Sequence, residues 1–243
     1  MSRFIYGVNP VLEALRAHPR DVVRVVVEHK KGEKVAQAAR DAGVRVDVIS
    51  TQELGHRAHG GVHQGVGAEL AEFEYAEPEE ILAAAKAKDE PAFVLVLDGV
   101  TDPQNFGALV RSAHALGAHG VIVPKDRAAG VTPAAAKAAA GALEHTLVAR
   151  VTNLSRAIDD LKEAGVWTVA LAGDAGRDLA SIDLKTPVAL VLGNEGAGVR
   201  PLVRKTCDHA ARIRLAGFES LNVSAAGAIA LYEVARQRAK SSA

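Results

Sequence analysis

The 243-residue chain contains only one cysteine, and that shortage excludes two classes of protein. The single thiol, Cys207, has no partner for an internal disulfide and cannot build a cysteine-rich zinc site. No stretch approaches the ~20 apolar residues that a membrane-spanning helix needs. Residues 1–7 also lack the apolar run of a secretory signal peptide. We therefore expect a cytoplasmic protein that folds without disulfides.

The chain also lacks net charge, since 29 Lys and Arg balance 29 Asp and Glu, but the balance is uneven along it. Residues 1–70 carry 10 basic and 8 acidic side chains, and residues 99–243 carry 17 and 13. Residues 71–98 between them carry only 2 basic and 8 acidic ones. Two mildly basic regions allow local phosphate contacts but form no strongly basic surface. We interpret the acidic stretch as the joint between two domains.

Apolar periodicity predicts an α/β unit on each side of this joint. Before it, three short strands and two helices are predicted, at 22–28, 44–49, 65–70, 9–17 and 33–42. After Pro91 the strands are continuously apolar, which is typical of a parallel sheet covered on both faces; they lie at 93–97, 120–123, 166–171 and 188–192. Helical spacing occurs at 81–88, 106–116, 134–142, 154–164 and 222–238. Ligands bind such sheets at the carboxyl ends of the strands, which directs attention to residues 98–111, 193–198 and 215–224.

The signatures of several common enzymes are missing. There is no G-x-x-x-x-G-K-[ST] sequence, which argues against a P-loop nucleotidase, and no G-x-S-x-G elbow, which argues against a serine hydrolase. No G-x-G-x-x-G follows a strand, so a nicotinamide dehydrogenase or a Rossmann-type methyltransferase is disfavoured. His56, His59 and His63 could be metal ligands, but a glycine-rich setting without a nearby cysteine favours solvated loop histidines. We therefore expect no metal site.

Three segments at the predicted strand ends carry polar residues suited to chemistry, and residues 97–113 form the first. Asn105 is expected at the start of a helix, where free N–H groups favour an anion, and Arg111 follows less than two turns later. Both side chains could approach one substrate. A helix-capping asparagine and a surface salt bridge of the arginine are the structural alternative.

The second segment has three glycines in six residues after a buried strand, which allows a ligand to approach closely around Glu195. A flexible connection with a helix cap is the alternative. The third segment, residues 213–227, places Ser220, Asn222 and Ser224 at a turn that leads into a helix of small residues. There the alternative is that Ser220 caps the helix.

Together the three segments resemble the motifs of the SpoU/TrmH family of RNA 2′-O-ribose methyltransferases, within the SPOUT superfamily. The first motif is matched by DPQNFGA at 102–108 with RSA at 111–113, the second by LGNEGAG at 192–198 and the third by SLNVS at 220–224. The amino-terminal piece, with IYG at 5–7 and VHQG at 62–65, resembles the family's L30e/L7Ae-like RNA-binding domain. Residues 98–103, 123–127 and 150–154 are most similar to the RlmB branch, whose members methylate a guanosine in the peptidyl-transferase loop of 23S rRNA.

This resemblance implies an L30e-like substrate-binding domain at 1–72, an acidic linker at 73–90 and a catalytic domain at 91–243. The fold class it implies is a SPOUT-type α/β knot, with a deep trefoil knot, a parallel sheet and helices on both faces. It also implies a homodimer with sites at the interface, an RNA substrate and S-adenosylmethionine as methyl donor, with no metal. The residues implied at the cofactor are Gly193, Gly196, Ile213, Leu215 and Leu221. Those implied in catalysis are Asn105, Arg111, Glu195, Ser220, Asn222 and Ser224.

The roles of these residues follow from the difficulty of the reaction, because a weakly acidic hydroxyl must lose its proton as it attacks. We expect Arg111 to hold the adjacent phosphate and stabilise the developing alkoxide, since a guanidinium with a pKa above ~12 stays charged. Asn105 would orient the ribose or Arg111, and Glu195 would fix Arg111 or the glycine-rich loop. Basic residues of the first domain would extend the RNA contact, namely Arg24, Lys30, Lys31, Lys34 and Arg57.

Three other functions stay open from the sequence. The same chemistry could act on tRNA or on another rRNA ribose. A non-catalytic RNA-binding protein would keep the fold without methyl transfer, and a small-molecule α/β enzyme is a third possibility. The intact set of Asn105, Arg111, Glu195 and Asn222 favours an enzyme.

Overall fold

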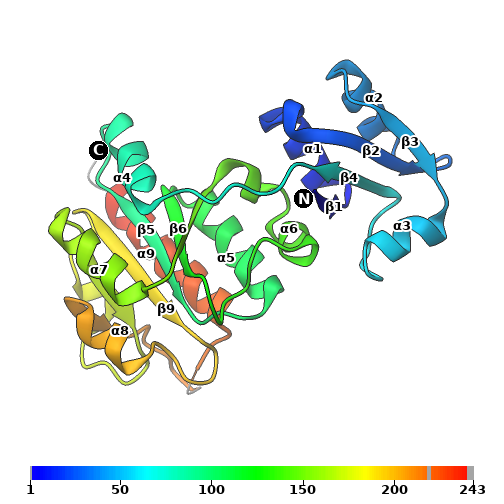
Figure 1. Ribbon diagram of the computed structural model, residues 1–243. Helices are drawn as coiled ribbons and strands as arrows, with labels where there is room; N and C mark the ends of the chain where they lie inside the picture. Colours follow the sequence, from blue (N-terminus) through cyan, green and yellow to red (C-terminus); the bar gives the residue numbers. More distant parts are fainter. Residues whose placement is uncertain (1, 218–219, 240–243) are drawn as a thin grey trace.

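The structure, a computed structural model, describes residues 2–217 and 220–239. It contains a four-stranded and a six-stranded β-sheet, and the smaller sheet with its helices lies to one side of the larger (Figure 1). None of the helices in the described part of the chain is long and apolar enough to cross a membrane.

The first sheet is mixed, with strand order β1-β4-β2-β3. Its strands are β1 (Arg3–Tyr6), β2 (Val22–Glu28), β3 (Val46–Ile49) and β4 (Val66–Leu70), and its helices are α1 (Val8–Ala17), the short η1 (Pro19–Asp21), α2 (Glu33–Asp41) and α3 (Thr51–Arg57). Successive side chains of β2 point to opposite faces of the sheet, so Val25 and Val27 pack in the core together with buried residues of α1 and α2. The opposite face packs on α3, where a Cβ added to Gly67 of β4 would lie 3.1 Å from Leu54.

The second sheet is entirely parallel, with strand order β10-β8-β9-β5-β6-β7. Its strands are β5 (Phe93–Asp98), β6 (Gly120–Pro124), β7 (Leu147–Val151), β8 (Trp167–Leu171), β9 (Val188–Gly193) and β10 (His209–Ala211). The central strands β5 and β9 are buried along their whole length. This double burial explains why their sequences are continuously apolar rather than alternating.

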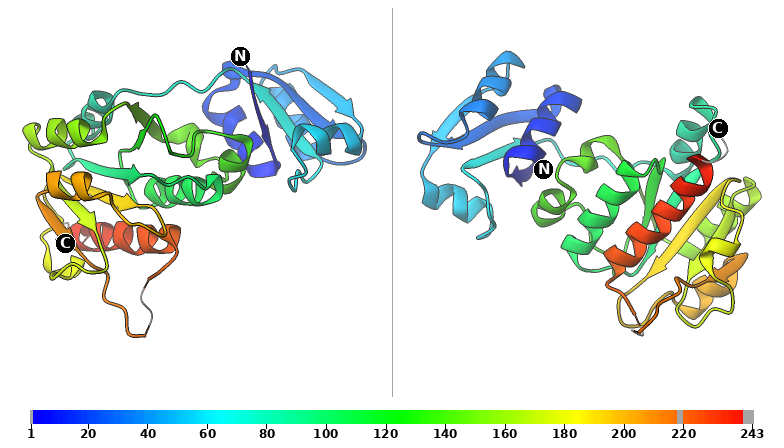
Figure 2. Two further views of the ribbon diagram at one scale, coloured as in Figure 1. Left: turned by 60° about the horizontal axis from the view of Figure 1, so that its bottom comes forward. Right: turned by 180° about the vertical axis from the view of Figure 1, so that it is seen from behind.

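Helices cover both faces of the parallel sheet (Figure 2). One face packs against α5 (Pro103–Ala115), α6 (Pro133–Ala139) and α9 (Val223–Ala239), and the other against α4 (Pro78–Ala87), α7 (Leu154–Glu163) and α8 (Pro201–Thr206). Short 3-10 turns η2 (Ala142–His145) and η3 (Leu179–Ser181) complete the unit. Gly107 lets α5 approach α6, because an added Cβ would lie 2.3 Å from the Ala135 carbonyl oxygen. Gly227 does the same between α9 and α5, since its Cβ would lie 2.2 Å from the Leu109 side chain.

The connection between the two sheets is anchored along its length. The Ala76 N–H donates to the carbonyl oxygen of Val148 on β7 at 3.0 Å, and the hydroxyl of Tyr75 accepts from the Val131 N–H at 3.1 Å. The last strand of the first sheet ends at Leu70 and β5 begins at Phe93. The domain limits expected at 72 and 91 stay a prediction.

Polar contacts also join the two sheets' units directly. Arg3 of β1 makes two hydrogen bonds to the buried carboxylate of Glu144 in η2, at 2.7 and 3.1 Å. Lys137 of α6 donates to the Gln64 side-chain oxygen at 2.8 Å, and the same oxygen accepts from the Val8 N–H at 3.2 Å, at the start of α1. The IYG and VHQG segments therefore meet at the junction with α6.

The main strands and helices predicted from the sequence are present, and those it missed are short or weakly patterned. Strands β1, β7 and β10 were missed, and β10 has only three residues, His209 and two alanines. Helices α3 and α8 were also missed. For α3 a signal existed, because the Ser50 hydroxyl caps the helix by accepting from the Glu53 N–H at 3.1 Å.

His119 is a buried histidine beside the start of β5. Its Nδ1 accepts from the Phe93 N–H at 3.0 Å, and its Nε2 lies 3.1 Å from a carboxylate oxygen of Glu90. The ring is therefore neutral, with its proton on Nε2. Burial lowers the pKa of His119 below its ordinary value of 6.5, against the smaller opposite effect of Glu90.

A histidine with a lowered pKa makes folding weaker in acid. Its contribution to the free energy of unfolding is complete above its unfolded-state pKa and is lost as the pH falls from there to the folded-state pKa. In His119→Asn the amide oxygen replaces Nδ1 as acceptor and cannot titrate. The free energy of unfolding in urea should therefore fall more for the wild type than for this variant as the pH is lowered from about 7.5 to about 5. Stability curves that stay parallel would contradict this assignment.

Candidate active site

The three motif segments meet at one carboxylate. Glu195 Oε1 accepts from the side-chain amide of Asn105 at 2.5 Å and from that of Asn222 at 2.7 Å. The Asn222 amide also lies 3.2 Å from Asn105 Oδ1. Charge-assisted hydrogen bonds of this kind are stronger than neutral ones, so one carboxylate fixes a side chain of α5 and a side chain directly before α9.

Each member of the cluster is positioned by its own element. At the start of α5, Asp102 caps the helix by accepting from the N–H groups of Gln104 and Asn105, both at 3.2 Å. The cap is thus Asp102, and the Asn105 side chain is left for Glu195. Before α9, Asn222 Oδ1 accepts from the Ser224 N–H at 2.9 Å and from its hydroxyl at 2.5 Å. Ser224 therefore orients Asn222 rather than facing Glu195.

The glycine-rich loop after β9 folds back on itself because Gly193 has no side chain. A Cβ at this position would lie 2.0 Å from the backbone carbon of Gly198. Asn194 and Gly198 form a two-way backbone pair, with N···O distances of 3.1 and 2.8 Å. The Asn194 side chain adds a bond to the Gly99 carbonyl at 3.0 Å and accepts from the Gly196 N–H at 2.9 Å. The loop is therefore held against the end of β5.

An ion pair between a buried carboxylate and an exposed guanidinium fixes the far end of the same loop. Asp98, the last residue of β5, is 1% exposed and accepts from the Arg200 N–H at 2.8 Å and from its Nε at 2.6 Å. Removing Arg200 would leave the buried Asp98 charge without compensation. Asp98 and Asn194 lie in segments to which the sequence directed attention, but neither was among the predicted site residues.

A cavity lies beside Glu195, lined by the ends of β8 and β9 and by the segment before α9. Four of the five predicted cofactor residues line it, namely Gly193, Ile213, Leu215 and Leu221, together with Ser220 and Glu195. Gly196 does not line it, and its N–H is used by Asn194. The walls also include residues 171–173, Leu192, Val223 and Ala226. Apolar walls with a few polar groups suit a nucleoside with an aliphatic arm.

The sequence missed the contribution of residues 171–173 to this cavity. They follow β8, and a signal existed, because the carboxyl ends of all parallel strands meet at one edge. The strand itself was predicted, but its end carries Ala172 and Gly173, which have no functional group to draw attention.

Arg111 does not lie with the other predicted catalytic residues. Its side chain is exposed and lines a second cavity, between α1, the carboxyl-terminal half of α5 and the turn before β7, which we call the interdomain cavity. Within the described residues it has no hydrogen-bonding or ionic partner. Of the alternative roles expected for Asn105 and Glu195, a contact with Arg111 is not made within the described part of one chain, and orientation of the ribose by Asn105 stays a prediction. Glu195 instead joins the loop to α5 and to the start of α9.

Thiolate chemistry finds no support in the structure. Burial raises the pKa of the Cys207 thiol to about 12, so the side chain stays protonated. Across residues 2–217 and 220–239, no group of three His, Cys, Asp or Glu side chains is arranged to hold a metal ion.

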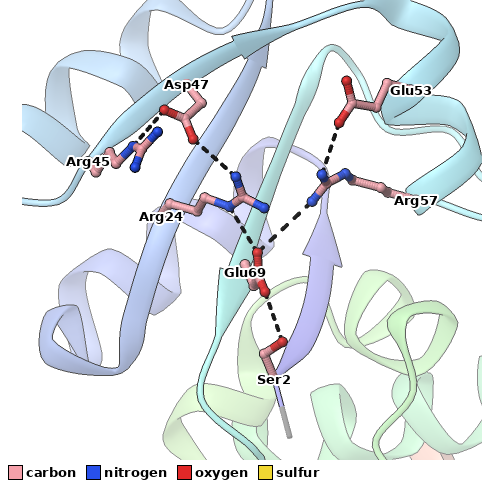
Figure 3. A network of polar contacts seen from close by, with 7 residues as sticks. All are labelled: Ser2, Arg24, Arg45, Asp47, Glu53, Arg57 and Glu69. Atoms are coloured by element: carbon pink, nitrogen blue, oxygen red, sulfur yellow. Dashed lines mark hydrogen bonds and ion pairs between the residues drawn. The ribbon is translucent and has the colours of Figure 1, made fainter.

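Two of the five basic residues expected to contact RNA lie in an ion-pair network on the first sheet (Figure 3). Arg24 donates to Glu69 at 2.9 Å and to Asp47 at 3.2 Å, and Arg57 donates to Glu53 at 2.9 Å. The network holds as many carboxylates as guanidinium groups, once Arg45 beside Asp47 is included. Because its positive and negative charges balance, the network attracts a phosphate only weakly. Lys31 also pairs with a carboxylate, that of Glu28 at 3.0 Å. The RNA contacts of all five, Lys30 and Lys34 included, stay a prediction.

Comparison with known proteins gives matches over almost the whole chain. Residues 92–232 match the SpoU rRNA Methylase family, and residues 4–76 match the RNA 2'-O ribose methyltransferase substrate binding family. The chain is 46% identical to the 23S rRNA (guanosine-2'-O-)-methyltransferase RlmB of Coxiella burnetii, over 96% of this chain and 95% of that protein. It is 41% identical to the protein of the same name from Yersinia pestis, over 98% of each.

Solved structures agree with these matches. The SpoU methyltransferase AviRb from Streptomyces viridochromogenes, in complex with the cofactor AdoMet, superposes with a TM-score of 0.83. It is 26% identical, and the superposition covers 98% of this chain and 91% of that one.

The tight loop after β9 leads us to expect different stabilities when each of two of its glycines is replaced by alanine. Gly193→Ala should destabilise the protein by at least the upper end of the ~1–3 kcal/mol typical of an overpacked site, because its Cβ meets backbone that cannot retreat. Gly196→Ala is the matched control, since its Cβ would make an ordinary contact of 3.7 Å with Asn194 Oδ1. Equilibrium unfolding of the two variants should differ clearly. Equal stabilities would mean that the loop is not closed as described.

Proposed function

The chain belongs to the SpoU rRNA Methylase family, and we propose that it transfers a methyl group from S-adenosylmethionine to the 2′-oxygen of a guanosine ribose in 23S rRNA. The protein is an RNA 2′-O-methyltransferase, and its SPOUT-type α/β fold class, predicted from the motifs, is confirmed. Because its substrate is ribosomal RNA, we propose that it acts in the cytoplasm. The choice of a 23S guanosine rests on the names of relatives 41% and 46% identical to it.

The observation that carries the proposal is the Glu195 cluster at the edge of the apolar cavity. It joins residues of all three motifs, Asn105, Glu195 and Asn222, next to walls that fit the methyl donor. Gly193 and residues 171–173 line the cavity largely with backbone and small side chains, which allows close contact with a nucleoside. Bound there, S-adenosylmethionine supplies a methyl group on a sulfonium, which needs no metal or redox step.

The protein's own residues have to align the ribose and manage one proton and one negative charge. In the reaction the 2′-oxygen forms a bond to the methyl carbon, the carbon–sulfur bond breaks with its electron pair left on sulfur as a neutral thioether, and the hydroxyl proton passes to solvent water. Glu195 and Ser220 line the cavity, and Glu195 holds the Asn105 and Asn222 amides at its edge. Such positioning is worth several kcal/mol when the reacting groups are held in line. A guanidinium stabilises the charge that develops on the sugar oxygen, and we assign this to Arg111.

A homodimer would bring Arg111 to a cofactor cavity that it does not line in its own chain. The exposed face of α9 is apolar, with Ala225, Ile229 and Tyr232 at helical spacing, and Ile229 and Tyr232 are 45% and 57% exposed. Helix α9 packs on α5, which carries Arg111. An apolar face of this kind on a two-fold axis would pair with its own copy and place Arg111 of one chain near the cavity of the other.

The direct test of the function is incubation with tritiated S-adenosylmethionine and undermethylated rRNA or tRNA, followed by mapping of the labelled nucleotide. Label on one 23S guanosine 2′-oxygen supports the proposal. Label on tRNA or another rRNA ribose would support the alternative substrates. Cofactor binding by calorimetry without any transfer would support the non-catalytic alternative.

Arg111 has a defined expected phenotype. Arg111→Ala should lower methyl transfer by about 100-fold or more, as does loss of other charge-stabilising donors. Arg111→Lys should fail as well, because an ammonium lacks the planar fork that grips phosphate. S-adenosylmethionine affinity and the melting temperature should stay at wild-type values, because the side chain is exposed and outside the cofactor cavity. An active alanine variant would refute the assignment.

Subunit mixing tests whether Arg111 acts on the partner's cavity. Arg111→Ala and Glu195→Ala chains should each be inactive, and each mixed dimer would contain one site with both residues intact. Unfolding and refolding equal amounts together should therefore restore about a quarter of the wild-type rate. Refolding either variant alone is the control. No recovery from the mixture would place both residues in one chain's site.

A further inference from the structure

The interdomain cavity has features that the methyl-transfer site does not use. Its volume is about 500 Å³, within the range of ligand pockets, and it is lined by Glu13 of α1, Arg111 and His114 of α5, residues 139–142 and His145. None of these lines the cofactor cavity. Helix α1 belongs to the unit that matches the substrate-binding family, so the cavity lies between that unit and the catalytic one.

Two histidine rings form a stacked pair in this cavity. The ring centroids of His114 and His145 are 5.5 Å apart, and the ring planes differ by 27°. Burial lowers the pKa of His114, and His145 lowers it further, so the His114 ring is uncharged at neutral pH. The His145 side chain is 35% exposed, which leaves part of the pair open to the cavity. Aromatic and histidine rings are the surfaces on which unpaired RNA bases stack.

The orientation of the His145 ring is fixed from α1. A carboxylate oxygen of Glu13 lies 3.1 Å from His145 Nε2, and the other accepts from Arg16 at 2.5 Å. His145, followed by Arg16, lowers the pKa of Glu13, so the carboxylate stays charged. Glu13 is therefore a positioning residue for the ring.

The backbone beside the rings is shaped to admit α1. Ala140 and Gly141 both have positive φ, 52° and 101°. A Cβ at Gly141 would lie 2.4 Å from Glu13 Cγ. A left-handed alanine is strained, and strain of this kind gathers at functional sites. The left-handed turn leaves space at Gly141 for Glu13, which can then come close to His145.

We propose that the interdomain cavity binds one unpaired nucleotide of the substrate RNA that flanks the methylated one, with its base on the His114–His145 rings and its phosphate at Arg111. This inference rests on the proposed function, because it takes Arg111 to hold an RNA phosphate. Arg111 is the cation in the cavity that has no partner among the described residues, so its charge is available. Stacking tolerates any base, so the site selects an unpaired nucleotide rather than a sequence.

The experiment tests whether the effect of removing one RNA base depends on the presence of one ring of the protein. A series of rRNA fragments is made, each with one abasic nucleotide near the methylated guanosine, and KM for methyl transfer is measured with wild type and with His145→Ala. At one flanking position the abasic change should raise KM by about 5- to 100-fold in wild type. The same change should have little further effect in His145→Ala, because the ring that contacts the base is already gone.

Two further variants separate base contact from domain packing. His114→Ala should show the same coupling at the same nucleotide. Lys137→Ala removes another polar contact between the two units, the 2.8 Å hydrogen bond to Gln64, but lies outside the cavity. It should keep the full abasic effect. S-adenosylmethionine affinity should be unchanged in all three.

The outcomes distinguish this inference from the proposed function. If the abasic change raises KM by the same factor in wild type and in the histidine variants at every position, the nucleotide site is overturned. Methyl transfer by the wild type would still support the proposed function. A Lys137→Ala variant that also loses the abasic effect would assign the coupling to domain packing and overturn it too. A wild-type protein that transfers no methyl group to RNA would refute the proposed function first.

Discussion

Oε1 of Glu195 accepts hydrogen bonds from two amides that lie 117 residues apart in the chain, one on Asn105 and one on Asn222. This meeting depends on the parallel pairing of β5 with β9, which sets Asp98 opposite Gly193 at the carboxyl ends of both strands. The missing Cβ of Gly193 then lets the following loop turn back at once and present Glu195. A single carboxylate therefore holds the loop, α5 and the start of α9 in one arrangement, and the cofactor cavity takes its shape from that arrangement.

Much of this could be predicted because burial leaves a direct mark on sequence. Strands β5 and β9 are apolar up to their last residues, Asp98 and Gly193, since helices cover both of their faces, and the three polar motifs lie at or after strand ends. Other elements leave no such mark. Strand β10 is made of His209 and two alanines, and its pairing with β8 is decided by tertiary contacts. Apolar periodicity also carries no information about threading, so the knot was an expectation from the family resemblance alone.

The position of Arg111 shows where spacing along a helix misleads. Asn105 and Arg111 are six residues apart, which suggested that both could approach one substrate. Six residues of an α-helix correspond to about 240° of rotation net of one full turn, so the two side chains leave α5 on different sides. Asn105 faces Glu195, and Arg111 faces the interdomain cavity. Sequence distance along a helix therefore has to be read together with angle, and only the packing of α5 reveals what each side meets.

Helix α5 therefore contributes residues to two places, the cofactor side of the catalytic unit and the junction with the amino-terminal unit. Its first turn carries Asn105 to the cofactor side, and its second half carries Arg111 and His114 to the junction with the amino-terminal unit. Gly107 packs it against α6, and Lys137 of α6 bonds to Gln64 of that unit. Because a packed α-helix keeps a fixed rise of about 1.5 Å per residue, the distance between these two contacts cannot change. RNA seated at the junction would therefore be held at a fixed position relative to α5, and in the proposed dimer Arg111 would carry that position to the cofactor cavity of the partner chain, where the ribose oxygen has to be aligned.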